Sequence, residues 1–194
     1  MPDLQTESIL QKNVAAASAT FTSLLSISPE IRKAGELIGA CLTSGNKLMT
    51  CGNGGSAADA SHFATEFVCR FQSDRLPRPA ISLCDSSTSL TAIGNDYGFD
   101  QVFARQLRAF ARPGDVLIAL TTSGQSRNII LALQAAKDLD IRSIAFLGKG
   151  GGAARGLATV DLIVPSQTTP RIQEAHVFLY HCLCEMVEPL IGSR

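Results

Sequence analysis

The sequence lacks a charge imbalance, closely paired cysteines and long apolar runs, and each absence narrows the range of functions. Lys and Arg together number 17, as do Asp and Glu, so the formal net charge is zero. Nucleic-acid-binding domains usually carry a clear basic excess, which is missing here. No stretch approaches the roughly 20 apolar residues that span a bilayer, and the start of the sequence has no basic and apolar signal pattern. We expect a cytoplasmic protein that binds neither nucleic acid nor membrane.

The cysteines are not spaced as metal ligands or as a disulfide framework. No Cys-x-x-Cys pair occurs, and most of the six lie inside apolar segments, which predicts reduced, buried side chains. With 194 residues, 45% of them apolar, and no linker or repeat, the chain is predicted to be one domain spanning residues 1–194. The cysteines are Cys41, Cys51, Cys69, Cys84, Cys182 and Cys184.

Short apolar runs alternate with helical patterns through most of the chain. Two helices, at 4–26 and 28–43, form an N-terminal pair within residues 1–44, with Ser28 predicted to cap the second helix before Pro29. The remainder, residues 45–194, predicts an α/β core whose parallel sheet is covered by helices on both faces. Strands are predicted at 47–52, 79–84, 115–121, 142–147 and 161–165, and helices at 56–69, 88–94, 99–110, 127–139 and 170–190.

Polar loops follow the predicted strands, and ligands of such sheets bind beyond the carboxyl ends of the strands. After the first strand, Asn53, Gly54 and Gly55 lead into a helix, where free backbone N–H groups suit a phosphate or hydroxyl. Ser56 is predicted to cap that helix, and Asp59 to complete a capping box.

A second loop, after the third strand, supplies a glycine and four hydroxyl groups, from Thr121, Thr122, Ser123 and Ser126. Such residues are also ordinary in turns, but two loops of this kind on one parallel sheet favour a phosphate site. Neither loop ends in Gly-Lys-Ser/Thr and no Gly-x-Gly-x-x-Gly occurs, so a nucleotide cofactor is not indicated.

The chain has only three histidines, and their spacing is informative. His62 and Glu66 are one helical turn apart, so both can reach one metal ion or one substrate. His176 and His181 lie in the last predicted helix, where His176 shares a face with Gln173 and His181 falls on another. The alternative is that these histidines only pack and form hydrogen bonds in the core.

Taken together, these segments resemble the phosphoheptose isomerases, a branch of the sugar-isomerase (SIS) domain family. The similarity runs through most of the chain, and the joint presence of His62, Glu66, Gln173 and His181 is specific to the isomerases. It is carried by CGNGGSAADASHFATEF (51–67), GNDYGF (94–99), LTTSGQSRNI (120–129), GKGGG (148–152) and RIQEAH (171–176).

The resemblance implies a three-layer α/β sandwich with a central five-stranded parallel sheet, assembled as a homotetramer with sites between subunits. It also implies one zinc ion per subunit, held by His62, Glu66, Gln173 and His181. Thr121 replaces a serine that is frequent in the family and keeps the hydroxyl, whereas Pro170 stands where some relatives carry an acid. Implied substrate-binding residues are Asn53, Gly54, Gly55, Ser56, Glu66, Asn95, Asp96, Thr121, Thr122, Ser123, Ser126 and Gln173.

The implied reaction converts sedoheptulose 7-phosphate into the aldose D-glycero-D-manno-heptose 7-phosphate, at the start of nucleotide-activated heptose biosynthesis, one use of which is lipopolysaccharide. The proton moves through an enediol, with Glu66 as the base and His181 as a second acid/base group. Zinc would polarise the carbonyl group. Gln173 and His181 are eight residues apart, about 12 Å of helical rise. Either the helix start is irregular, long side chains close the gap, or the two ligands belong to different chains.

Two other functions share these loops. One is a non-catalytic phosphosugar-binding or replication-initiator-associating SIS protein, which would lack part of the polar set that this chain keeps. The other is an arabinose 5-phosphate isomerase, which would share the loops without the pattern from Arg171 to His181.

Overall fold

The computed structural model describes residues 2–192, with side chains from Thr6 onward. Met1, Ser193 and Arg194, which the predicted domain includes, lie outside the described residues. The predicted alternation of strands and helices is confirmed. The elements are α1 (Pro2–Ser23), η1 (Leu24–Ile27), α2 (Ser28–Thr43), β1 (Leu48–Gly52), α3 (Gly55–Val68), β2 (Ala80–Ser82), α4 (Ser87–Tyr97), η2 (Phe99–Gln101), α5 (Val102–Phe110), β3 (Val116–Thr121), α6 (Arg127–Asp138), β4 (Arg142–Leu147), η3 (Lys149–Ala154), β5 (Val160–Ile163) and α7 (Thr169–Val187).

The five strands form one parallel sheet in the order β2-β1-β3-β4-β5. The chain moves outward from β1 in one direction to β2 and in the other direction to β3, β4 and β5. Open α/β sheets bind ligands beyond the carboxyl ends of the two strands at such a reversal, here β1 and β3. The two predicted anion-binding loops leave these same two strands.

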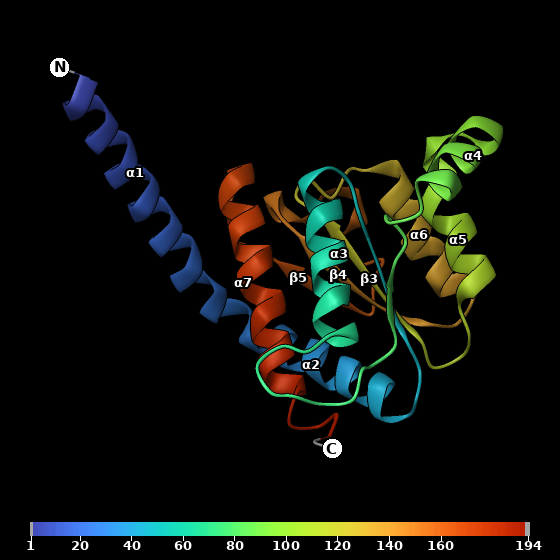
Figure 1. The fold of residues 1–194 in the computed structure, drawn as a ribbon. Helices are drawn as coiled ribbons and strands as arrows, with labels where there is room; N and C mark the ends of the chain where they lie inside the picture. The colour runs from blue at the N-terminus through green and yellow to red at the C-terminus, as the bar shows by residue number, and fades with distance from the viewer. Residues whose placement is uncertain (1, 193–194) are drawn as a thin grey trace.

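Helices cover both faces of the sheet, which confirms the three-layer sandwich (Figure 1). Side chains alternate along each strand, so Ile118 and Leu120 join a core with α2, α3 and α7. Leu117 and Ala119 point to the other face and join a core with α5 and α6. Since the interior strands are buried on both faces, they read in the sequence as continuous apolar runs.

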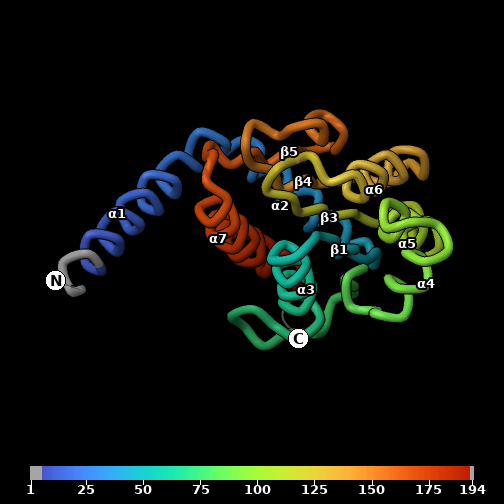
Figure 2. Tube along the Cα trace, turned by 90° about the horizontal axis from the view of Figure 1, so that it is seen from above, coloured from blue at the N-terminus to red at the C-terminus, as the bar shows by residue number. Residues whose placement is uncertain are grey.

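Helix α1 extends away from the rest of the molecule (Figures 1 and 2). Its second half is attached to α7, where Arg171 donates hydrogen bonds to the backbone and side-chain oxygens of Asn13 at 2.8 and 3.0 Å. The rings of Phe21 and Phe178 lie 5.3 Å apart. The first half projects from the body of the molecule in both views, and Ile9 and Leu10 there are exposed.

Several predicted boundaries need correction. The first helix ends at Ser23 and continues as a 3-10 turn, and the helix predicted at 99–110 begins with a 3-10 turn, η2. Ser28 is not a cap: it is the first residue of α2, and its hydroxyl donates to the carbonyl of Leu25. Strand β2 is only three residues long because it pairs with β1 alone at the edge of the sheet.

The cysteines are free thiols, as predicted, but only three of the six are buried. Cys69 is exposed because it follows the last turn of α3, and Cys84 and Cys182 are half-buried. Burial raises the pKa of the Cys41 thiol to about 12, so this side chain stays protonated and packs as a small apolar group. Among residues 2–192, no helix combines the length and the apolar character needed to cross a membrane.

Candidate active site

The turn into α3 differs from the predicted capping box. Gly54 occupies the N-cap position with φ of 55°, in a region that favours glycine, and no side chain caps the helix. Ser56 is buried inside the first turn, so the prediction that it caps α3 together with Asp59 is wrong. The N–H groups of Ala57 and Ala58 donate to the Gly54 carbonyl. Those of Gly55 and Ser56, which no side chain caps, can bind an anion.

An amide pair links the turn after β1 to the helix after β3. The Asn53 side chain donates to Asn128 at 2.8 Å, and Asn128 donates back to Asn53 at 2.9 Å. Asn53 directly follows β1, and Asn128 lies in the first turn of α6, which follows the loop after β3. The pair holds the start of α3 beside the first turn of α6.

The loop from Thr121 to Ser126 is ordered by its own hydroxyl groups. The Thr121 hydroxyl accepts from the N–H of Gly124 at 3.3 Å and lies 3.4 Å from the Ser126 hydroxyl. Ser123 accepts from the N–H of Gln125 at 3.2 Å. Thr122 is half-buried in the same loop. The four predicted hydroxyls therefore lie together at the carboxyl end of β3.

Glycines let a second loop pack against this one. Gly124 has φ of 64°, and a Cβ there would overlap the carbonyl group of Gly151. The N–H of Ala154 donates to the Gly124 carbonyl at 2.9 Å. The GKGGG segment thus fixes the shape of the hydroxyl loop through backbone contacts.

Helices α3 and α7 lie side by side and bring the predicted catalytic residues together (Figure 2). The side chains of His62, Glu66 and His181 each offer a ligand atom, and these atoms lie within 4.8 Å of one another. His62 Nε2 is 2.8 Å from a Glu66 carboxylate oxygen, and the rings of His62 and His181 are 5.3 Å apart. Two segments more than a hundred residues apart in the sequence therefore meet at one point.

Buried aromatic residues hold this cluster in place. The Tyr180 hydroxyl lies 2.8 Å from His62 Nδ1, and the Tyr180 ring stacks on Phe63. The Phe71 ring stacks on His181, with ring centroids 5.6 Å apart. Each imidazole is thus oriented by a neighbour that is not itself a candidate metal ligand.

Burial favours the neutral form of one member of the cluster, His181. Burial, with a smaller contribution from His62, lowers the pKa of His181, which favours its neutral imidazole. Burial raises the pKa of Asp59, which lies one turn before His62 on α3. His176 is different: it is fully buried, it donates to the Leu147 carbonyl at 3.3 Å, and burial lowers its pKa to about 4. His176 therefore packs in the core, whereas His181 belongs to the site.

The donor set fits a zinc ion. Two imidazole nitrogens and a carboxylate oxygen are ligands that zinc accepts, and catalytic zinc sites use three protein ligands with one open position. The exposed fraction of the His62 side chain is 50% and that of Glu66 is 17%, so the cluster is open on one side. His62, Glu66 and His181 would hold the metal.

Gln173 lies in the first turns of α7, eight residues before His181. Helix α7 is continuous from Thr169 to Val187, which excludes an irregular start. The Gln173 amide lies against Gly55, where a Cβ would collide with it, about 10 Å along α3 from His62. Asn95 and Asp96 are also separate: they are exposed on α4, where Asn95 donates to Asp96 at 2.8 Å. Figure 1 places α4 on the opposite side of the molecule from α7.

Sequence reasoning missed the residues that support the site. Asn128 lies within the LTTSGQSRNI segment and could have been noticed there. Tyr180 precedes His181, but nothing in its spacing reveals that its hydroxyl faces His62. Phe71 lies in a loop with no local signal, because its role depends on how two helices pack.

Comparisons with known proteins agree with this geometry. The SIS domain family model matches residues 14–148. The chain is 51% identical over 162 residues to a phosphoheptose isomerase from Citrifermentans bemidjiense, covering 84% of each protein. It is similar to the solved phosphoheptose isomerase of Neisseria gonorrhoeae, with 41% identity, a TM-score of 0.81, and 93% and 99% of the two chains covered.

A second solved structure, the phosphoheptose isomerase of Francisella tularensis, has 35% identity and a TM-score of 0.89, with 97% of this chain and 100% of that chain covered. Sequence and fold agree over nearly the whole length. This chain belongs to the phosphoheptose isomerase branch of the SIS domain family and is a sugar-phosphate isomerase.

Proposed function

We propose that this protein converts sedoheptulose 7-phosphate into D-glycero-D-manno-heptose 7-phosphate, for nucleotide-activated heptose biosynthesis. The observation that supports this most strongly is the cluster of His62, Glu66 and His181, on a chain 51% identical to a phosphoheptose isomerase. A ketose-to-aldose conversion needs a base for a carbon-bound proton and a second group for the oxygens. The cluster offers both. We also propose that residues 1–194 form a single SIS domain.

Glu66 is the proposed base that removes the proton from C1 of the ketose and returns it to C2. Its carboxylate is fixed by His62 at 2.8 Å, which limits its rotation and aims its other oxygen at the substrate. His181 is the second acid/base group: its lowered pKa favours the neutral ring, which can accept a proton at one nitrogen and donate at the other. These two residues move the protons between C1 and C2 and between O2 and O1.

The loops at the carboxyl ends of β1 and β3 are the proposed phosphate site. The backbone N–H groups of Gly54 and Gly55 and the hydroxyls of Thr121, Ser123 and Ser126 can all donate to phosphate oxygens. The loops hold the phosphate by hydrogen bonds from neutral groups, which suits release of a small metabolite. A zinc ion on His62, Glu66 and His181 would polarise the substrate carbonyl when bound.

We propose that each site is shared between copies of the chain in a homotetramer. Ser56 and Glu66 are separated by about 15 Å of helical rise, so one chain would have to stretch the sugar along most of α3 to use both. The Gln173 amide, the fourth proposed zinc ligand, lies against Gly55, about 10 Å of helical rise from His62 in its own chain. A second copy of the chain can supply the missing side chains.

The extended half of α1 supports this assembly. Ile9 and Leu10 have exposed fractions of 55% and 63%. Helices in proteins are stabilised mainly by packing of an apolar face, which this half of α1 does not find in its own chain. Another copy would cover it.

A complementation experiment tests the shared site. Glu66→Gln and Gln173→Ala chains are each purified, mixed under conditions that allow subunit exchange, and assayed. If the two residues serve one site from different chains, the mixture contains intact sites and is more active than either variant. No recovery despite proven exchange would place both residues of each site in one chain.

Direct incubation tests the substrate. The purified protein is given sedoheptulose 7-phosphate, and separately arabinose 5-phosphate, and the products are followed by NMR. Formation of the heptose aldose only from the first supports the proposal. Conversion of arabinose 5-phosphate instead would favour the other isomerase, and binding without conversion of either would favour a phosphosugar-binding or replication-initiator-associating protein.

A further inference from the structure

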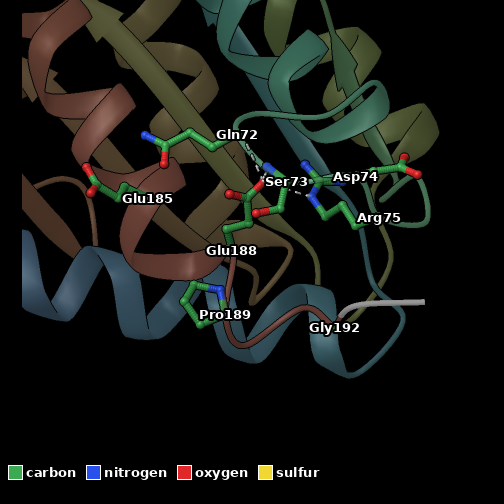
Figure 3. Close-up of a pocket in the computed structure, with 8 residues that line it drawn as sticks. All are labelled: Gln72, Ser73, Asp74, Arg75, Glu185, Glu188, Pro189 and Gly192. Atoms are coloured by element: carbon green, nitrogen blue, oxygen red, sulfur yellow. Dashed lines mark hydrogen bonds and ion pairs between the residues drawn. The ribbon is translucent and has the colours of Figure 1, made fainter.

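A buried ion pair joins the ends of the two helices that carry the proposed catalytic residues. The side chain of Arg75, from the loop after α3, is 3% exposed, and its Nε lies 3.7 Å from the carboxylate of Glu188, which is 12% exposed at the end of α7. Figure 3 shows Glu188 beside Gln72, Ser73 and Arg75, between the loop and the last turn of α7.

Arg75 binds the end of α3 directly. One guanidinium nitrogen donates to the carbonyl of Glu66 itself at 2.6 Å, and another donates to the carbonyl of Phe67 at 2.9 Å and to that of Leu76 at 3.2 Å. The last four carbonyls of a helix have no partner within the helix, and a cation there also complements the helix dipole. Arg75 therefore fixes the backbone from which the Glu66 side chain projects.

Glu188 binds the loop from the other side. One carboxylate oxygen accepts from the backbone N–H groups of Gln72 and Ser73, both at 3.2 Å. A carboxylate at the C-terminus of a helix is unfavourable for that helix. The position of Glu188 is therefore better explained by its hydrogen bonds to the loop than by any stabilisation of α7. Glu188 is the C-cap residue of α7 and lies about two turns after His181.

The loop also touches His181. Phe71, which immediately precedes the two N–H donors, stacks on the His181 ring. One short loop therefore contacts the backbone of Glu66, the ring of His181 and the end of α7. Removing two charges from water costs free energy, and an apolar pair of similar volume often stabilises a fold as well or better. The directed contacts point to a role beyond stability.

We propose that the Arg75–Glu188 pair is a positioning device that sets the spacing of Glu66 and His181 for proton transfer. Neither residue touches the substrate in this scheme. They act through the Glu66 carbonyl and the Phe71 ring. The inference rests on the proposed function, because spacing matters for turnover only if these two side chains carry the reaction.

The chain offers a matched control for the test. Asp115 is also a buried carboxylate; it accepts from the N–H groups of Lys47 and Arg112 and forms an ion pair with the Lys47 side chain. It lies at the start of β3, at the opposite end of the sheet from the proposed site. Glu188→Gln and Asp115→Asn each remove one charge. The two loop N–H groups share one oxygen of Glu188, so the glutamine keeps an acceptor for both. The two N–H groups at Asp115 bind different oxygens, so the asparagine keeps an acceptor for only one of them, and the control is the more disruptive change.

Steady-state kinetics on sedoheptulose 7-phosphate compares the two variants at a temperature where circular dichroism shows both to be folded. Glu188→Gln is expected to lower kcat by about tenfold to a hundredfold with little change in KM, because small displacements of catalytic groups cost this much. Asp115→Asn is expected to stay within about twofold of the unmodified protein. Equal kcat values for the two variants would overturn the proposal.

A spectroscopic readout separates this inference from the proposed function. With only three histidines, ring signals from labelled histidine are resolvable and can be assigned with single substitutions. Glu188→Gln is expected to shift the His181 ring signal, because the Phe71 ring moves relative to it, while Asp115→Asn leaves it in place. An unshifted His181 signal would overturn the proposal even if the unmodified protein proves inactive on this substrate.

A second variant, Arg75→Lys, tests the proposal if the Glu188→Gln protein does not fold. Arg75→Lys keeps the buried charge but lacks the planar guanidinium whose separate nitrogens reach the two helix carbonyls and Glu188 in fixed directions. It is expected to give the same loss of kcat and the same His181 shift. Full turnover by folded Arg75→Lys protein would contradict the proposal.

Discussion

Removal of one hydroxyl group, by Tyr180→Phe, tests how the candidate metal site is held. The Tyr180 ring is fully buried, and its hydroxyl is 2.8 Å from His62 Nδ1. With Glu66 accepting from Nε2, Nδ1 accepts the hydroxyl proton. When a metal occupies Nε2, the proton moves to Nδ1 and Tyr180 becomes the acceptor. The hydroxyl can serve both states of the imidazole.

The size of the effect follows from burial. A hydrogen bond of this kind contributes about 1 kcal/mol to folding, and an orphaned buried partner costs more. The exposed fraction of the His62 side chain is 50%, so water can replace the hydroxyl, and the loss of folding free energy should remain about 1 kcal/mol. Water cannot orient the His62 ring as the fixed Tyr180 hydroxyl does. Loss of a hydrogen-bond partner that orients a metal ligand lowers metal affinity by about 10- to 100-fold.

Competition with a chelating dye measures the zinc affinity. Urea unfolding of the metal-free protein measures the change in folding free energy. The control is Tyr97→Phe, since Tyr97 is the only other tyrosine and lies exposed on α4 with the Arg105 guanidinium over its ring. Zinc affinity that is unchanged in Tyr180→Phe, or reduced equally in Tyr97→Phe, would refute the reasoning.

Two further predictions concern the loops and the core. Gly124→Ala forces a side chain into a positive-φ position against the Gly151 carbonyl. It should lower the free energy of unfolding by about 2 kcal/mol or more and raise the KM for the substrate. The control is Gly94→Ala, in a helix with open space around it, which should leave stability unchanged or increase it. Steady-state kinetics measures the KM of each variant, and urea unfolding measures its stability. Burial lowers the pKa of His176 to about 4. Between pH 6.5 and 4, this imidazole is therefore protonated in the unfolded chain and neutral in the folded chain. Stability should then fall by about 3 kcal/mol as the pH drops from 6.5 to 4, and be restored above 6.5. His176→Gln should show a correspondingly smaller acid loss in unfolding measured across that range; an equal loss would exclude His176 as its source.

The layout of the fold was predictable because its signals are local. Buried parallel strands give continuous apolar runs, so all five strands were placed within a few residues. The turn at Gly54 was identified as a helix start, but the capping residue was misassigned, since a serine near a helix N-terminus reads as a cap whether it precedes the helix or lies within it.

The site was predictable only in part. The spacing of His62 and Glu66 on one helix is local, whereas their contact with His181 depends on the packing of α3 against α7, which only the family resemblance implied. The same resemblance assigned Gln173 to the metal, and in this chain its amide lies against Gly55, at the start of α3. Arg75 and Glu188 gave no sequence signal, because their partners are backbone groups brought together by the fold.

The most direct measurement on the catalytic proposal is the turnover of Glu66→Gln, which retains the shape of the side chain but cannot take a proton from carbon. Its kcat on sedoheptulose 7-phosphate should fall by about 100- to 10,000-fold, while binding of the substrate, measured by calorimetry, should change little. Normal turnover by this variant would show that another group removes the proton.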